Sequence, residues 1–330
     1  MSKFPLFQLP GVPRTLVFQL MDPEQVIELT FIYRAIKETV SLSKLRASHF
    51  LLLLHNPPCN SIKIVIQFSE NSINFTLIAK IEYSEEAFSS WEIDGNPVHG
   101  QKLNKTNFSL FSGKTYSDQE LVVKSLTQHF HEIMRFNDYS FRAIQVSLKS
   151  IMSNFIWKHT KKFRDFVYYQ NEIDTSATSK ELKFLLEEIT VNQLELRLKP
   201  EIHPTVSKLK LKLSTMQLDY SLSIHFDSYF DMKCEKVWIT VSIVNSEDIV
   251  NFVRNWLDGN LENLQFFSVE IRNDVFDEDF IFSKFKQFMI EFPPDHPKHN
   301  TRPNIRDIKQ SSGKSARLSF YLKKFEFEVE

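Results

Sequence analysis

The chain has 330 residues, of which 42% are hydrophobic and 25% are charged, as is typical of a globular protein. Its 40 lysines and arginines oppose 41 aspartates and glutamates, so no overall field attracts nucleic acid or an anionic membrane surface. With only 6 glycines, the chain is poorly suited to Gly-rich phosphate-binding loops. This composition argues against a dedicated nucleic-acid binder.

The cysteines and the apolar runs of the chain indicate in which cellular compartment the protein resides. Cys59 and Cys234 lie far apart and neither belongs to a CxxC pair, which argues against a disulfide framework or a zinc site. Three prolines interrupt the first 13 residues, where a signal peptide needs a continuous apolar stretch. The longest apolar run, at 50–54, is too short to span a bilayer. We therefore expect a soluble cytoplasmic or nuclear protein with no metal, cofactor or membrane contact.

Residues 1–46 have the pattern of a small helical module. Pro10 and Pro13 stand where a helix start tolerates missing N–H groups, and Asp22-Pro23 ends that helix and opens the next. The second run carries an apolar stripe at helical spacing, formed by Val26, Ile27, Leu29, Ile32, Tyr33, Ile36 and Val40. A segment of this size cannot hold a core of its own, so we expect it to dock on another protein and to be separable from the rest of the chain.

Residues 47–149 are predicted to be a strand-rich region with one helix. Runs of β-branched and aromatic residues predict strands at 49–55, 61–69, 74–83 and 141–148. The run at 61–69 alternates, so one face of that strand is expected to be solvated. Polar and turn residues predict an exposed loop over 92–118, and capping and apolar spacing predict a helix over 117–137.

Residues 150–330 repeat a strand–helix–strand signal. Strands are predicted at 164–169, 191–199, 216–224, 236–243 and 264–271, with amphipathic helices at 179–188 and 246–259. Intervals of roughly twenty to thirty residues are typical of leucine-rich-repeat-like solenoids. An ordinary α/β sandwich whose alternation imitates a period is the alternative. The predicted class is therefore a small helical module followed by a strand-rich α/β body (α+β or α/β), with a leucine-rich-repeat-like solenoid toward its C-terminus.

The N-terminal module resembles the F-box, specifically the F-box of the large nematode family with a C-terminal F-box-associated domain. The resemblance runs to about Lys44 and is carried by an FPL lead-in, a Leu-Pro pair and a Met-Asp-Pro stop, at Phe4, Pro5, Leu6, Leu9, Pro10, Met21, Asp22 and Pro23. Where the family has a Leu-Ser pair and a further Ser, this chain has Leu29-Thr30 and Tyr33.

The C-terminal part supports the same assignment. Segments 179–200 and 251–271 are similar to the F-box-associated domain. The most telling piece is a helix end at Trp256-Leu257, followed by Gly259 as an expected left-handed cap.

This resemblance implies a non-catalytic, substrate-recruiting subunit of an SCF-type ubiquitin ligase. The F-box would bind a Skp-type adaptor and through it a cullin scaffold, while the body would hold an unknown protein substrate. The residues assigned to the adaptor contact are Pro5, Leu6, Leu9, Pro10, Val12, Leu16, Met21, Pro23 and Leu29.

Two alternatives stay open at this point. The same apolar side chains can pack on the chain's own β region instead of on a partner. The whole protein can equally be a leucine-rich-repeat-like interaction module unconnected to ubiquitin, with its N-terminal helices merely capping the array.

Other motifs favour structural interpretations. His129 and His131 suggest a metal pair, but residues i and i+2 point to different sides of a helix. The basic and aromatic cluster at 157–164 could contact nucleic acid, although a solvated face is the better interpretation. The histidines at 293–299 fall in a Pro-rich stretch that gathers such residues by chance. Because no Walker loop, Ser elbow or HExxH motif is present, we expect no catalysis.

Overall fold

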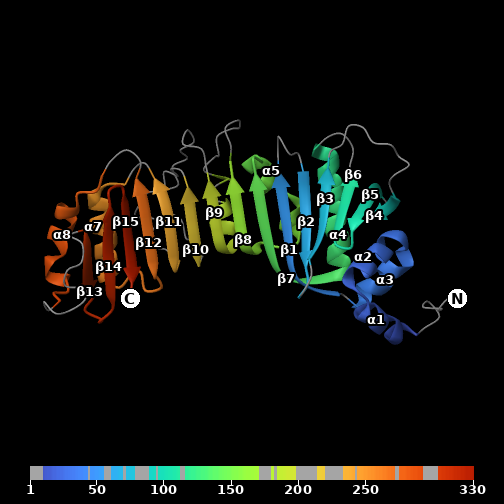
Figure 1. Cartoon of the computed structure of the whole chain (residues 1–330), viewed down its shortest axis with the longest axis horizontal. Coiled ribbons are helices and arrows are strands. Elements are labelled where there is room, and N and C mark those ends of the chain that lie inside the picture. The colour runs from blue at the N-terminus through green and yellow to red at the C-terminus, as the bar shows by residue number, and fades with distance from the viewer. Residues whose placement is uncertain are drawn as a thin grey trace. The chain divides into compact units, whose positions relative to one another are not determined.

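A computed structural model describes the chain over fourteen stretches, and all structural statements concern these: 10–43, 45–55, 61–69, 72–78, 89–93, 96–111, 116–170, 180–181, 184–197, 214–219, 233–241, 244–271, 275–292 and 304–330. They fall into two compact units, one within residues 1–146 and 154–160, the other within 147–153 and 161–330. Each unit combines helices with a sheet (Figure 1), so the predicted mixed α/β class is confirmed.

The first unit begins with three short helices. These are α1 (Gly11–Leu20), α2 (Pro23–Ile32) and α3 (Arg34–Ser43), and α4 (Tyr116–Ile133) follows later in the chain. The strands are β1 (Leu45–His55), β2 (Ser61–Gln67), β3 (Ser72–Ile78), β4 (Ser89–Ile93), β5 (Asn96–Asn104), β6 (Asn107–Phe111) and β7 (Met134–Ile144), and a 3₁₀ turn spans Phe155–Lys158. Their order across the sheet is β7-β1-β2-β3-β6-β5-β4, parallel at β1/β7 and β3/β6 and antiparallel elsewhere.

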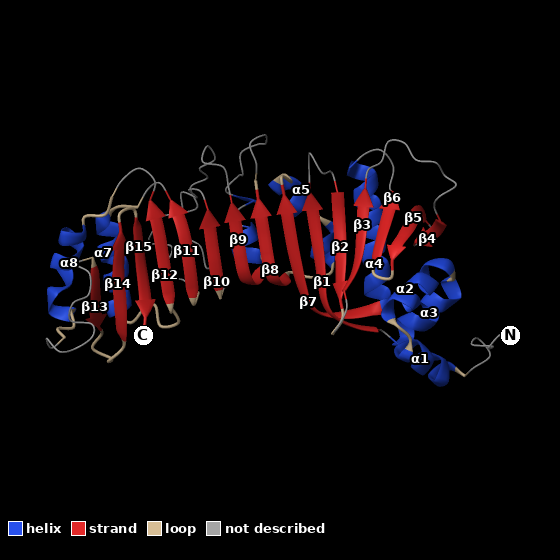
Figure 2. Cartoon of the chain, in the orientation of Figure 1, coloured by secondary structure: helices blue, strands red, loops and turns tan. Residues whose placement is uncertain are grey.

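Helix α4 covers one face of this sheet (Figure 2), and the burial pattern of β2 shows why. Ile62, Ile64 and Ile66 are fully buried on that face, while the alternating residues Lys63 and Val65 are half-exposed on the other. The solvated face predicted for this strand is thus confirmed. Apolar residues at every second position pin the strand register, because a slip of one residue would expose all three isoleucines.

The N-terminal helices differ from prediction in one place. Pro10 and Asp22 are the N-caps of α1 and α2 and Pro23 is the first residue of α2, as expected. The second helical run, however, breaks at Tyr33, whose backbone is extended (φ −129°, ψ 110°). No Pro or Gly marks this break in the sequence. It separates Phe31, which enters the core beside the sheet, from Ile36, which begins the buried face of α3.

The prediction of an exposed loop over 92–118 is wrong. Most of the segment is a meander of β4, β5 and β6, whose inward residues Trp91, Val98 and Phe108 are buried. The intervening Asn, Gly and Lys residues hid the alternation. Asn104 makes the β5–β6 turn, since its side-chain oxygen accepts a hydrogen bond from the Thr106 N–H at 3.0 Å.

The helix predicted over 117–137 ends earlier, and the strand predicted over 141–148 begins earlier. Helix α4 stops at Ile133 and β7 starts at Met134, with no loop between them. The strand ends at Ile144 because Gln145 adopts a left-handed backbone (φ 61°). A short helix then starts after Ser147, whose hydroxyl caps it by accepting from the Ser150 N–H.

The second unit contains α5 (Leu148–Met152), α7 (Ser246–Leu257), α8 (Glu278–Phe285) and helical turns at Phe184–Glu188 and Lys286–Phe288. Its strands are β8 (Lys162–Tyr169), β9 (Thr190–Arg197), β10 (Thr215–Asp219), β11 (Lys236–Val241), β12 (Phe266–Ile271), β13 (Ile305–Lys309), β14 (Ser315–Tyr321) and β15 (Lys324–Val329). Strands β8 to β12 lie side by side in chain order and are all parallel. Antiparallel β15, β14 and β13 then extend the sheet beyond β12.

The five strands predicted for this region are therefore confirmed wherever the structure describes them, except that β12 begins at Phe266 and not at 264. Residues 220–224, which completed the third of those strands, lie outside the described residues, as do 293–299. Of the helix predicted at 179–188, the described parts are residues 180–181, in an α-helical turn, and Phe184–Glu188, in a π-type turn.

Helix α7 has complete signals at both ends. Asn245 and Asp248 exchange side-chain and backbone hydrogen bonds in a capping box, one residue before the predicted start. At the other end Gly259 is left-handed (φ 86°), as predicted, and the N–H groups of Gly259 and Asn260 bond to the carbonyls of Trp256 and Asn255. This is a Schellman motif, which only glycine forms without strain at that position.

The apolar face of α7 packs on the sheet through aromatic rings. Phe252 stacks on Phe267 of β12 with ring centroids 4.1 Å apart, and it meets Phe327 of β15 edge-on at 5.5 Å. Trp256 is 1% exposed and contacts Phe327 edge-on at 5.1 Å. The predicted burial of Trp256 is confirmed, and the many phenylalanines of this chain serve such ring contacts.

Candidate functional site

The helical segment α1–α3 has an inner face that belongs to the core of the first unit. Phe31 of α2 is 2% exposed and stacks on Trp91 of β4, with centroids 5.6 Å apart and planes 29° apart. It also meets Phe75 of β3 edge-on at 6.0 Å. Gly100 makes room for this arrangement, because a Cβ there would lie 2.5 Å from the Trp91 ring.

A buried hydrogen bond joins α2 to α4. The Thr30 hydroxyl donates to the carbonyl of Ile27 (2.7 Å), so it must accept from Nε2–H of His129, 2.9 Å away. Nδ1 of His129 has no hydrogen-bond partner among the described residues. Burial, with a smaller effect of the Lys37 charge, lowers the pKa of His129 to about 3. This histidine is therefore neutral and structural.

Ion pairs complete the attachment of the segment. Lys37 of α3 lies 2.8 Å from Glu132 of α4, and Glu28 of α2 pairs with Lys102 of β5. Partial burial alone would raise the pKa of Glu132, but hydrogen bonds from Lys37 and Gln128 and the Lys37 charge lower it below its usual value. Helix α2 shares core and charges with the sheet and α3 is paired with α4, so the segment is part of the first compact unit. That the remainder folds without residues 1–46 stays a prediction. The alternative that part of this segment packs on the chain's own β region holds for its inner face.

The outer face of the same segment, meaning its exposed residues, combines large apolar side chains with polar ones such as Gln19, Gln25 and Glu38. Ten large hydrophobic side chains are exposed in the described part of the chain, and five of them lie within α1–α3 and the Tyr33 break. Their exposed fractions are 53% for Leu16, 87% for Leu20, 53% for Ile32, 54% for Tyr33 and 83% for Leu42. Gathering of apolar side chains on a short segment is typical of a protein–protein contact.

The residues predicted to contact an adaptor differ in their exposure to solvent. Leu16 and Pro10 are exposed, and Met21, Pro23 and Leu29 are half-buried. Pro5, Leu6 and Leu9 lie outside the described residues, and so does the side chain of Val12. Sequence reasoning left Leu20 and Leu42 out of the adaptor contact, and it placed Ile32 and Tyr33 in the apolar stripe without assigning them to that contact. The spacing of Leu16 and Leu20, four residues apart on one helix face, was the available signal for the first of these.

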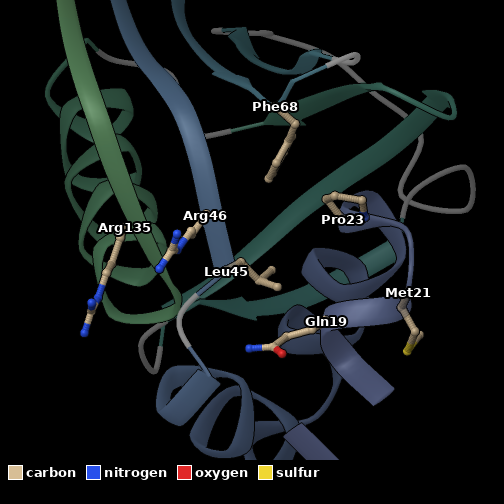
Figure 3. A pocket seen from close by; sticks show the side chains of 7 residues that line it. All are labelled: Gln19, Met21, Pro23, Leu45, Arg46, Phe68 and Arg135. Atoms are coloured by element: carbon tan, nitrogen blue, oxygen red, sulfur yellow. The ribbon is translucent and has the colours of Figure 1, made fainter. Parts of the chain in front are cut away.

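A pocket opens at the junction of α1 and α2 with the ends of β1, β2 and β7 (Figure 3). Its volume is about 540 Å³, within the range of ligand and side-chain pockets. It is lined by Gln19, Met21, Pro23, Leu45, Arg46, Phe68 and Arg135. Met21 and Pro23 therefore belong both to the predicted adaptor contact and to this pocket.

The histidines of α4 face different partners, as the i, i+2 argument predicts. Nδ1 of His131 donates to the carbonyl of Thr127 at 2.7 Å, so its Nε2 accepts from the Tyr139 hydroxyl at 3.1 Å. Burial lowers the pKa of His131 to about 4. Within the described stretches, no group of three His, Cys, Asp or Glu side chains is arranged to hold a metal ion.

Several residues of the basic and aromatic cluster at 157–164 form contacts within the protein itself. Trp157 lies beside Phe141 at 6.0 Å, Phe163 is buried, and Arg164 pairs with Asp165 at 2.9 Å. Lys161 pairs with Glu188 at 3.1 Å. These contacts agree with a solvated face beside a core.

Among the helices that the structure describes, none is long and apolar enough to cross a membrane. Comparison of the chain with protein-family models, curated proteins and solved structures found no match.

Proposed function

We propose that this protein is the substrate-recruiting subunit of an SCF-type ubiquitin ligase. In this proposal α1–α3 form an F-box that binds a Skp-type adaptor, and the adaptor connects the chain to a cullin scaffold in the cytoplasm or nucleus. The rest of the chain holds a target protein and performs no chemistry, because it acts through proximity and orientation alone.

The observation that carries the proposal is the two-sided character of α1–α3. The inner face packs on the sheet through Phe31 and is joined to α4 through Thr30 and Lys37. The outer face keeps Leu20 and Leu42 in water at exposed fractions of 87% and 83% in the described structure. Such exposure is unfavourable by roughly 1.5–3 kcal/mol per large side chain relative to burial, so a partner that covers this face gains that energy.

The target-binding body is proposed to include a leucine-rich-repeat-like array. Support comes from β8 to β12, which follow one another in chain order, all parallel, with starts about twenty to thirty residues apart. Thr215, Lys236 and Phe266 stand in one row across β10, β11 and β12. The strand face opposite α7 carries Trp238 and Phe266, half-exposed and 5.2 Å apart, as an aromatic pair suited to a protein contact.

A rival function is favoured by one observation. The packing of Phe31 against Trp91 and Phe75 is what a helical cap on an interaction module requires, with no link to ubiquitin. A cap, however, gives no reason for the exposed leucines on the outer face. The two functions therefore differ in what happens when that face alone is changed.

Recovery of the adaptor with the tagged full chain from cells tests the proposal. The unchanged chain should carry the Skp-type adaptor and the cullin, and Leu16→Asp with Leu20→Asp should lose both. The matched control is Leu121→Asp with Leu322→Asp, which changes two leucines exposed to 56% and 83% elsewhere. Failure of the unchanged chain to recover the adaptor, or equal recovery by all three proteins, would leave the capped interaction module as the better account.

A further inference from the structure

One side of the pocket beside α1 and α2 is cationic. Arg46 of β1 and Arg135 of β7 are partners in the parallel register, so they stand on adjacent strands roughly 4.8 Å apart at one side of the pocket (Figure 3). Both side chains are exposed, and neither forms an ion pair or hydrogen bond with another described residue. Two guanidinium groups on neighbouring strands, with no counter-charge among the described residues, repel each other, and neither can lose its proton.

The remaining lining is mostly apolar. Leu45 and Phe68 are each 8% exposed and form the side that belongs to the sheet. Met21 and Pro23, at the α1–α2 junction, form the opposite side, and both are half-buried. An occupant that complements this lining has an apolar part for these four residues and a negative charge for the arginines.

The acidic residues on either side of Pro23 do not neutralise the arginines, and Glu132, three residues before Arg135, is paired with Lys37. Asp22 is exposed at the N-cap of α2, and Glu24 is buried in the first turn of that helix. Neither is in a described ion pair with Arg46 or Arg135. Guanidinium groups bind carboxylates with two parallel hydrogen bonds, which makes a carboxylate the matching group from outside the chain.

We propose that this pocket receives an acidic segment of the adaptor, with an apolar side chain between Phe68 and Met21 and a neighbouring carboxylate at Arg46 and Arg135. The inference rests on the proposed function, since the pocket shares Met21 and Pro23 with the predicted adaptor contact. It extends that contact from the helices onto β1 and β7. The adaptor would then contact both the helices and the junction between the helices and the sheet.

Titration calorimetry of the full chain with a purified Skp-type adaptor tests this at two salt concentrations. Arg46→Glu with Arg135→Glu should weaken binding about 10- to 100-fold and remove most of its salt dependence. Arg46→Gln with Arg135→Gln should have a smaller effect in the same direction. The matched control, Lys124→Glu with Arg142→Glu, changes two exposed cations of the same unit that do not line this pocket and should bind as the unchanged chain does. Thermal unfolding midpoints confirm that all variants are folded.

The outcomes separate this inference from the proposed function. If the unchanged chain does not bind the adaptor, the proposed function fails together with the inference. If the unchanged chain binds and both arginine variants bind within twofold of it, only the inference fails. A small anion would be the occupant instead if acetate or inorganic phosphate alone raised the unfolding midpoint of the unchanged chain but not of the Gln variant, with adaptor affinity unaltered.

Discussion

Phe31 and Ile32 are neighbours in sequence with opposite surroundings, being 2% and 53% exposed. Phe31→Ala should lower the free energy of unfolding by about 3–5 kcal/mol, because it removes the ring between Trp91 and Phe75. Ile32→Ala should change it by less than about 0.5 kcal/mol and instead weaken adaptor binding. Urea unfolding and a binding titration on both variants check the contrast. Equal stability loss would mean that Ile32 is also part of the core.

The two structural histidines of α4 predict a pH dependence. The folded-state pKa values of His129 (about 3) and His131 (about 4) lie below the ordinary 6.5, mainly because of burial. Below pH 6.5 the unfolded chain therefore binds protons that the folded chain does not, and stability is lost as the pH falls toward 4. At pH 5 the loss should be about 2 kcal/mol for each histidine.

Urea unfolding at pH 7 and pH 5 measures this loss. His131→Phe, whose new ring would lie among Phe50, Phe136 and Tyr139, should show a smaller pH effect than the unchanged chain. An identical pH effect in both proteins would show that folding does not lower the pKa of His131.

At the scale of elements, the capping box and Gly259 set the ends of α7, and the rings of Phe252 and Trp256 pack it on the sheet. Trp256→Ala should lower the free energy of unfolding of the second unit by about 3–5 kcal/mol, because the indole is 1% exposed against Phe327. Trp238→Ala, on the half-exposed opposite face of the sheet, should cost clearly less. Denaturant titrations followed by far-UV circular dichroism make the comparison. A cost below about 1 kcal/mol for Trp256→Ala would contradict the packing.

Elements with local signals could be predicted, and elements set by tertiary contacts could not. The end of α7 was readable because Gly259 is a cap that needs no other part of the chain. Strands β4 and β5 were missed because their few inward residues, such as Trp91 and Val98, stand among turn-forming residues. The break at Tyr33 has no sequence signal, since it follows from where Phe31 meets the sheet.

The candidate site was predictable to a similar degree. The apolar character of α1 and the Met-Asp-Pro junction pointed to a docking surface, and Leu16 is indeed exposed. The split of the segment into an inner and an outer face was not readable, because it depends on contacts with β3, β4 and α4. The arginine pair was equally hidden, since only the β1/β7 register brings Arg46 beside Arg135.

At the scale of the whole molecule, the proposed function assigns adaptor binding to the first unit and target binding to the rest of the chain. In this proposal α1–α3 bind a Skp-type adaptor through their outer face. The most exposed leucines of that face, Leu20 and Leu42, should then be decisive for binding and irrelevant to folding.

The most direct test is a calorimetric titration of the purified full chain with a purified Skp-type adaptor. The account predicts saturable one-to-one binding that Leu20→Asp with Leu42→Asp weakens at least about a hundredfold, since two lost anchors remove about 3 kcal/mol or more. The unfolding midpoint of that variant should equal that of the unchanged chain. Absence of binding by the unchanged chain, or undiminished binding by the variant, would contradict the account.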